Sequence, residues 1–269
     1  MKKLHKLIIV TFIVVVLSCN DNGKVVDLSQ HPNIQKTYDP SVPITIISNA
    51  IIKTNYKDSI YPKDFEAVFM DSTFVKEITE RGQSTYSFHT VNIGKIKIES
   101  GHIIACDPSF MQHGKPFTDK FPIGNFDVQL SIANIPVQNN RVAFSRILFS
   151  SNPVRKWVYA TREGEEKVPI NDSTLYSFPV DAGLAIYIDQ TARDVFNAYD
   201  SKDFMKVFVN GMEKEGNFFG YVHNFESHNL ATFSTGYGDG SYGSFIGLDK
   251  NGEICRLVSD LGILMWWKK

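Results

Sequence analysis

Short runs of β-branched and aromatic residues recur along the chain from residue 95 onward, and several alternate between apolar and polar positions. Runs of this kind, bounded by Gly, Pro or Asn clusters, predict β-strands. They lie at residues 95–100, 102–107, 126–135, 141–150, 156–163 and 179–189. We therefore expect an α+β fold dominated by strands: a largely antiparallel sheet or sandwich with two or three short helices packed on it.

Apolar residues also recur at helical spacing in two regions. Residues 62–82 predict a helix with a break near Asp71 and Ser72. The second region follows Asp189, whose short acidic side chain is suited to capping a helix. Its two pieces carry Val195, Phe196 and Tyr199, and then Phe204, Val207 and Phe208.

The sequence Asp-Lys-Asn-Gly from Asp249 to Gly252 separates two apolar runs within residues 245–258. A type I turn followed by a left-handed glycine closes hairpins of this kind. This segment therefore predicts a β-hairpin.

The N-terminus combines a basic start with an apolar run from Leu7 to Leu17. This pattern is typical of an export signal, because a membrane span needs about 20 apolar residues. The tetrapeptide Val16-Leu17-Ser18-Cys19 resembles the lipobox of bacterial lipoproteins. That resemblance implies that Cys19 is acylated and becomes the mature N-terminus. An ordinary secretory signal with an incidental cysteine is the alternative.

These features predict a lipoprotein signal peptide at residues 1–18, a flexible tether at 19–43 and a single globular domain at 44–269. The tether is polar, lacks periodicity and has a root-mean-square span of roughly 25 to 30 Å. We expect a bacterial cell-envelope protein, anchored to the membrane by its lipid and facing the periplasm or the cell surface.

The net charge limits the classes of binding partner that we expect, and the cysteine content limits the possible disulfides. The chain has 28 basic and 29 acidic residues, and three of the basic ones lie in the signal peptide, so the mature chain is acidic. Without a basic stripe, nucleic acid is not an expected partner. An oxidising compartment permits a disulfide between Cys106 and Cys255, but their apolar surroundings favour buried free thiols.

Residues 238–243 match the dinucleotide fingerprint G-x-G-x-x-G, with Asp260 at the distance of the ribose-binding acid. The fingerprint requires a helix that begins at the third glycine, because the helix N-terminus holds the pyrophosphate. Residues 244–249 predict a strand instead, so we expect no nucleotide cofactor.

Other catalytic and metal-binding motifs are absent from the sequence or incomplete in it. The sequence contains no G-x-S-x-G elbow and no H-E-x-x-H pair. Four residues between Asp249 and Asp260 occupy calcium-loop positions, but Ile254 stands where that loop requires glycine. His223 and His228 lack a carboxylate at metal-site spacing. We therefore assign no catalytic residue, metal or cofactor.

Five ordered segments carry a family resemblance: SGHIIACDPSF, FPIGNFDVQLSI, RVAFSRILF, PVDAGLAIYID and residues 231–264. Together they resemble the bacterial domain-of-unknown-function family 4241, whose hallmark is a G-D-G motif, over roughly residues 95–264. The resemblance implies no activity. Tyr237 stands where the family pattern usually has Trp. The resemblance implies that the signature positions are Asp107, Asp181, Gly238, Asp239, Gly240 and Asp260.

The acids among these positions have structural explanations when each is taken alone. Asp107 precedes a proline and fits a turn, Asp181 lies in an apolar run where a carboxylate needs a partner, and Asp239 lies between glycines. Together they suggest a polar pocket that accepts hydroxyls or a cation. Its candidate members are Asp107, Asp181, Tyr237, Gly238, Asp239, Gly240, Tyr242 and Asp260.

Two functions fit this pocket. The first is a binding or interaction module for a small-molecule or protein ligand, with Tyr237, Tyr242 and Asp239 as contacts, because tyrosine gives contact area at low entropic cost. The alternative is a carbohydrate or metal-dependent hydrolase that uses Asp181 and Asp239. Carboxylates about 5 Å apart would indicate a retaining glycosidase, and roughly 6.5 to 9.5 Å an inverting one.

We predict that Cys19→Ser releases the protein from membranes, because the acyl chains attached to that sulfur are its only expected anchor. Fractionation of cells after a salt wash measures this release. A variant that still sediments with membranes would contradict the lipid anchor.

Overall fold

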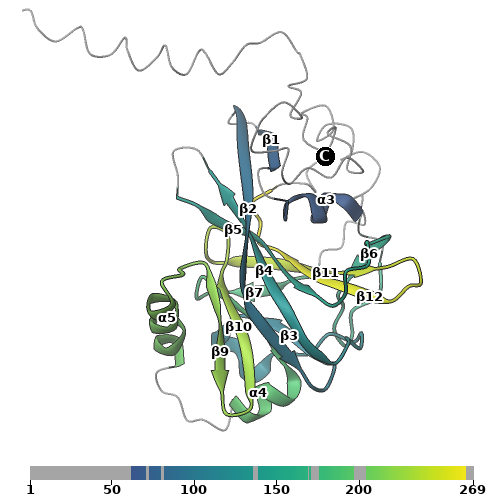
Figure 1. Cartoon of the computed structure of the whole chain (residues 1–269), viewed down its shortest axis with the longest axis vertical. Helices are drawn as coiled ribbons and strands as arrows, with labels where there is room; N and C mark the ends of the chain where they lie inside the picture. The colour runs from purple at the N-terminus through teal and green to yellow at the C-terminus, as the bar shows by residue number, and fades with distance from the viewer. Residues whose placement is uncertain are drawn as a thin grey trace, which may run out of the picture.

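The computed structural model describes residues 62–70, 73–79, 82–135, 139–168, 170, 176–196 and 204–264. Its strands form two antiparallel sheets (Figure 1). The large sheet has the order β1 (Thr73–Thr79), β2 (Gly82–Ile98), β4 (Gly124–Asn134), β5 (Arg141–Leu148), β12 (Ile254–Asp260), β11 (Gly240–Leu248) and β6 (Lys156–Tyr159), and β7 (Phe178–Val180) also pairs with β11. The small sheet has the order β3 (Ile103–Cys106), β8 (Leu184–Asp189), β10 (His228–Ser234) and β9 (Gly220–Phe225).

The main core lies between the two sheets. Strand alternation turns one apolar face of each sheet inward, where the side chains pack against each other. The large sheet contributes Ile96, Val128, Leu130, Val142, Ile147 and Leu257, and the small sheet contributes Ile103, Ala185, Tyr187, Ala231 and Phe233. The expected strand-dominated α+β fold, with antiparallel sheets and a few short helices, is confirmed.

Helices pack on part of the outer face of each sheet (Figure 1). α4 (Gln190–Phe196) and α5 (Phe204–Glu215) pack on the small sheet through a second apolar cluster that includes Phe196 and Phe208. α3 (Pro62–Ala67) inserts Phe65 among Phe144, Trp157 and Phe245 on the large sheet. Each of these contacts buries apolar side chains on the outer side of a sheet.

A hydroxyl network crosses the main core. The buried Tyr187 hydroxyl lies 2.8 Å from the Ser145 hydroxyl and donates to the Ser259 hydroxyl at 2.7 Å, and Ser259 also contacts the Ser244 hydroxyl. Burial raises the pKa of Tyr187 to about 12, so it stays protonated. The three serines lie on adjacent strands of the large sheet, so the network links both sheets through satisfied polar groups.

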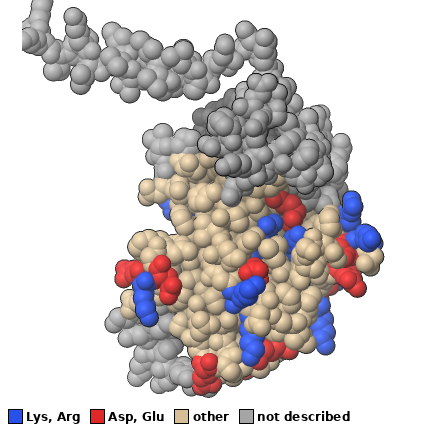
Figure 2. Space-filling view, in the orientation of Figure 1, with Lys and Arg blue, Asp and Glu red and all other residues tan. Residues whose placement is uncertain are grey.

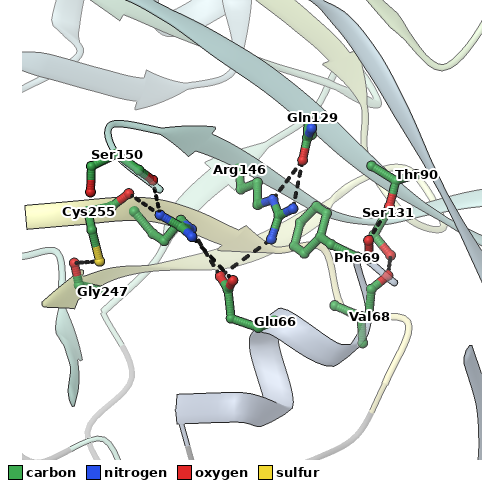
Figure 3. A network of polar contacts seen from close by, with 11 residues as sticks. Glu66, Val68, Phe69, Thr90, Gln129, Ser131, Arg146, Ser150, Gly247 and Cys255 are labelled. Carbon is green, nitrogen blue, oxygen red and sulfur yellow. Dashed lines mark hydrogen bonds and ion pairs between the residues drawn. The ribbon is translucent and has the colours of Figure 1, made fainter. Parts of the chain in front are cut away.

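A second polar network holds α3 against the outer face of the large sheet (Figure 3). Glu66 accepts hydrogen bonds from Arg146 at 3.4 Å and from Arg256 at 3.2 Å. Arg146 also donates two hydrogen bonds to Gln129, and its guanidinium lies 4.0 Å from the Phe69 ring centroid. Burial lowers the pKa of Arg146 to about 10, which still leaves it charged at neutral pH. Glu66 is thus the carboxylate shared by two cations, the buried Arg256 and the largely buried Arg146.

Several predicted elements are confirmed. The β11–β12 hairpin turns at Asp249–Gly252, and Gly252 has φ +80°. Asp189 caps α4 by accepting from the Thr191 amide, and it also accepts from the Glu99 and Ser100 amides. Both described cysteines are free and buried, as expected.

One predicted helix is wrong in its second half. Residues 73–79 form β1 and pair with β2, whereas only residues 62–67 of the predicted segment are helical. Side chains four residues apart share a face in a helix and in a strand, so the spacing of the apolar residues did not distinguish them. The hydrogen-bonded pairing with β2 makes residues 73–79 a strand.

The prediction of one continuous strand over residues 179–189 is also wrong. The chain forms β7 and β8, separated by a turn at 181–183 in which Gly183 has φ +63°. Asp181 therefore lies on an exposed turn and not within an apolar strand. β6 ends at Tyr159, short of the expected residue 163, and the β9–β10 hairpin was not predicted.

The segments predicted to be a signal peptide and a tether, and Tyr199, lie outside the described residues. Within the described part, no helix has the length and apolar character needed to cross a membrane.

We predict that Glu66→Gln lowers the free energy of unfolding by about 2 to 3 kcal/mol, because it leaves two buried guanidiniums without their shared carboxylate. Urea unfolding measures the change. The control is Asp127→Asn, which breaks an exposed ion pair with Lys95 and is expected to cost less than about 1 kcal/mol. Equal losses in the two variants would contradict a stabilising role for the network.

Candidate functional site

Two loops from different parts of the chain meet where the sheets adjoin. The turn at 181–183 connects β7 to β8, and residues 235–239 connect β10 to β11. Val180 pairs with Gly240, and the Thr235 amide donates to the Gly183 carbonyl at 3.1 Å. A Cβ added to Gly183 would lie 3.8 Å from the Gly238 Cα. We call these two segments the paired loops.

Asp107 holds the first of the paired loops. Its buried carboxylate accepts the Asp181 and Ala182 amides, each at 2.7 Å, and the Ser109 amide at 2.6 Å. The last of these bonds caps the 3₁₀ helix η3 (Pro108–His113). Hydrogen bonds from backbone N–H groups to a carboxylate are stronger than neutral ones. Asp107 therefore fixes the turn that presents Asp181.

The second loop is held by its own hydroxyl groups. The Gly238 carbonyl accepts from the Thr235 hydroxyl at 2.8 Å and from the Tyr242 hydroxyl at 2.6 Å. Tyr242 is buried, and burial, together with the nearby charges of Asp239 and Asp260, raises the pKa of its hydroxyl. The Tyr242 hydroxyl is therefore protonated at neutral pH, and it donates its hydrogen to the Gly238 carbonyl within the protein.

Gly236 allows this loop to lie against the end of β12. The Gly236 amide donates to the Val142 carbonyl at 3.1 Å, and its φ is +36°. A Cβ at this position would lie 2.0 Å from the Leu261 carbonyl oxygen. Next to it, the buried Asp260 accepts the Gly262 amide at 2.9 Å and so stabilises the turn after β12.

Three side chains of the paired loops remain available to solvent. Asp181, Asp239 and Tyr237 are exposed, and 55% of the Tyr237 surface is accessible. Val180 and Gly240 are the last pair of the β7–β11 ladder, and Asp181 and Asp239 are the residues adjacent to this pair on the two loops. Exposed carboxylates accept hydrogen bonds and attract cations, so these loops favour a ligand that carries hydroxyls or positive charge.

The predicted pocket residues therefore divide into two groups. Asp181, Tyr237, Gly238 and Asp239 lie on the paired loops, and Gly240 follows as the first residue of β11. Asp107, Tyr242 and Asp260 are buried, and their side chains make internal hydrogen bonds.

Sequence reasoning missed two residues at this site. The guanidinium carbon of Arg141 lies 5.8 Å from the Tyr237 ring centroid. The Thr235 hydroxyl donates to the Gly238 carbonyl within the second of the paired loops. Nothing local to Arg141 indicated this contact, because it arises from the pairing of distant segments. For Asp181, the neighbouring Ala-Gly step was a usable signal for a turn.

In the described part of the chain, no group of three His, Cys, Asp or Glu side chains is placed to hold a metal ion. His228 contacts Glu99 at 2.5 Å, and Glu99 also contacts Lys97. His223 packs between aromatic rings that include Phe225 and Phe208. The Asp249 carboxylate accepts turn amides from Asn251 and Glu253, as the hairpin requires.

A family model described as "Protein of unknown function (DUF4241)" matches residues 96–259, more than half of the chain. The chain belongs to this family. The part of the chain matched to DUF4241 includes the paired loops and Asp107, whereas α3 and β1 lie before it. Searches of curated proteins and of solved structures found no match.

We predict that Gly236→Ala lowers the free energy of unfolding by about 3 kcal/mol, through both backbone strain and the clash with the Leu261 carbonyl. Gly216→Ala is the matched control, because Gly216 has φ +63° but open space around its missing Cβ. It is expected to cost about 1 kcal/mol. Similar losses in urea unfolding would show that the close approach at Gly236 is unimportant.

Proposed function

We propose that this protein is a lipid-anchored binding module of the bacterial cell envelope. Its ligand contacts Asp181, Tyr237 and Asp239 on the paired loops. The ligand, a small molecule or an exposed part of another protein, carries hydroxyl or cationic groups at the contact.

One observation supports this proposal most directly. The backbone of the paired loops is held by internal hydrogen bonds, whereas three of their side chains are exposed to solvent. Asp107, Thr235 and Tyr242 hold this backbone by hydrogen bonds. Within the described residues, the carboxylates of Asp181 and Asp239 make no hydrogen bond or ion pair, and the exposed ring of Tyr237 contacts the Arg141 guanidinium. A rigid backbone reduces the entropy lost when the loops bind a ligand. An exposed tyrosine beside free carboxylates then supplies contact area and hydrogen-bond acceptors.

The charge distribution is compatible with this proposal. On the face drawn in Figure 2, the described residues are mostly uncharged, and the basic side chains lie in separate small groups near acidic ones and form no continuous basic stripe. Binding to nucleic acid depends on such a stripe, because phosphate contacts supply most of the affinity. A nucleic-acid partner therefore forms no part of the proposal.

The anchor is proposed from the sequence alone. A lipid on Cys19 and a flexible segment to residue 43 would keep the globular domain close to the membrane yet free to turn. A site on such a domain can reach ligands in the adjacent envelope layer.

A thermal-shift screen of the full-length chain in detergent tests the binding function. The panel contains soluble cell-wall glycan fragments, amino sugars, calcium chloride and oligopeptides. A ligand that binds only the folded protein must raise its melting temperature, by RT ln(1 + [L]/Kd) in free energy. We expect at least one probe to raise it in the wild type.

The same shift is expected to disappear in Asp239→Asn and Tyr237→Ala. The control is Glu213→Gln, which changes an exposed acid on α5, away from the paired loops. If every shift persists in both loop variants, the paired loops are not the ligand site.

A further inference from the structure

The loops at one end of the small sheet carry every exposed aromatic side chain of the described residues. These side chains are Phe110, Phe218 and Tyr237, which are 42%, 69% and 55% exposed. A surface on which large apolar side chains gather is often an interaction site. This end of the small sheet is therefore a candidate binding surface that is wider than the paired loops.

The order of the small sheet brings these residues to the same end, although they are far apart in the sequence. β3, β8, β10 and β9 are neighbours in that order, and each neighbouring pair is antiparallel. The ends of β3 and β10 and the starts of β8 and β9 therefore lie together. Phe110 follows the end of β3, Tyr237 follows the end of β10, and Phe218 precedes the start of β9.

Hydrogen bonds connect the segments that carry the two phenylalanines to the paired loops. The Phe110 amide donates to the Asp107 carbonyl at 3.0 Å, and the Asp107 carboxylate accepts two amides of the first loop. Next to Phe218, the Phe219 carbonyl accepts the Ser234 amide at 2.9 Å, immediately before the second loop. Both phenylalanines therefore border the paired loops.

The three rings are distributed across the whole width of the small sheet. Phe110 belongs to the loop after the edge strand β3, Phe218 to the loop before the other edge strand β9, and Tyr237 to a loop between them. Adjacent strands lie about 4.8 Å apart, so the four strand ends span roughly 14 Å. A ligand that contacts all three rings is therefore elongated.

The carboxylates on the same surface limit the chemistry of that ligand. Asp181 and Asp239 are exposed, and within the described residues their carboxylates make no hydrogen bond or ion pair. Ionised carboxylates accept hydrogen bonds from hydroxyls and repel anions. The face of an aromatic ring carries partial negative charge and attracts polarised C–H groups. A sugar ring supplies both partners, because it has C–H groups on its faces and hydroxyls at its edge.

We propose that this end of the small sheet binds a neutral oligosaccharide. Its sugar rings pack on Phe110, Tyr237 and Phe218, and its hydroxyls donate to Asp181 and Asp239. This inference rests on the proposed binding function and specifies its ligand as a glycan without acidic groups. It also adds Phe110 and Phe218 to the binding surface.

The test is calorimetric titration of the full-length chain in a detergent without a sugar headgroup. The probes are four neutral tetrasaccharides, built from glucose, xylose, mannose or N-acetylglucosamine, and the corresponding monosaccharides. We expect at least one tetrasaccharide to bind, and its monosaccharide to bind about tenfold more weakly or worse, because one sugar covers one aromatic ring.

The variants test the role of the two phenylalanines. Phe110→Ala and Phe218→Ala should each weaken binding of that tetrasaccharide about tenfold, whereas Phe110→Tyr and Phe218→Tyr, which keep the ring, should restore most of the affinity. The control is Ile123→Ala. Ile123 is 63% exposed and lies near the opposite end of the small sheet, where the Phe121 amide donates to the Gly101 carbonyl before β3. This variant should bind as the wild type does.

Different failures separate this inference from the proposed function. If no tetrasaccharide binds, or if both alanine variants bind it as tightly as the wild type, the glycan assignment is wrong. The binding function still stands if another probe gives a thermal shift that depends on Asp239. If sedimentation shows a wild-type dimer that Phe218→Ala dissociates, the surface joins two copies of the chain and the glycan assignment is likewise wrong. If no probe gives a shift that depends on Tyr237 or Asp239, both proposals fail.

Discussion

A buried carboxylate organises the region on which the functional proposal depends. The chain passes from the large sheet to the small sheet at residues 181–183, and this crossing leaves two amides outside either ladder. Asp107 accepts both, and it accepts a third amide from the start of η3. Asp107 thus supplies acceptors for backbone donors that the sheet ladders leave unpaired, as nearly all backbone groups in folded proteins require. The position of Asp181, and through Gly183 that of the second loop, follows from this constraint.

Similar polar contacts hold other junctions of the fold. Tyr187 joins the two sheets through serine hydroxyls, and Glu66 joins α3 to the large sheet through two arginines. Each lies where apolar packing alone would allow neighbouring elements to slide, because apolar contacts have little directionality. The side chains left outside these networks, Asp181, Tyr237 and Asp239, gather on one pair of loops. That contrast is the physical basis for regarding the paired loops as the binding surface.

Local sequence signals predicted much of the fold but little of the site's internal geometry. The β11–β12 hairpin followed from four turn residues, and most strands followed from short-range alternation. The strand at 73–79 was mistaken for a helix because its pairing with β2 was not evident locally. The bond from Asp107 to Asp181 spans 74 positions, so no local pattern could reveal it. The family resemblance did select the acids that meet there, although it did not indicate which would be buried.

Hydrogen exchange at the amides of Asp181 and Ala182 tests the central claim most directly. These amides lie on a surface turn, yet their bonds to a buried carboxylate should protect them in the wild type. In Asp107→Asn, which keeps the shape but replaces one acceptor oxygen by a donor, both should exchange at least tenfold faster while β11 and β12 keep their protection. Equal exchange rates at these two amides in both proteins would contradict the claim that Asp107 fixes the paired loops.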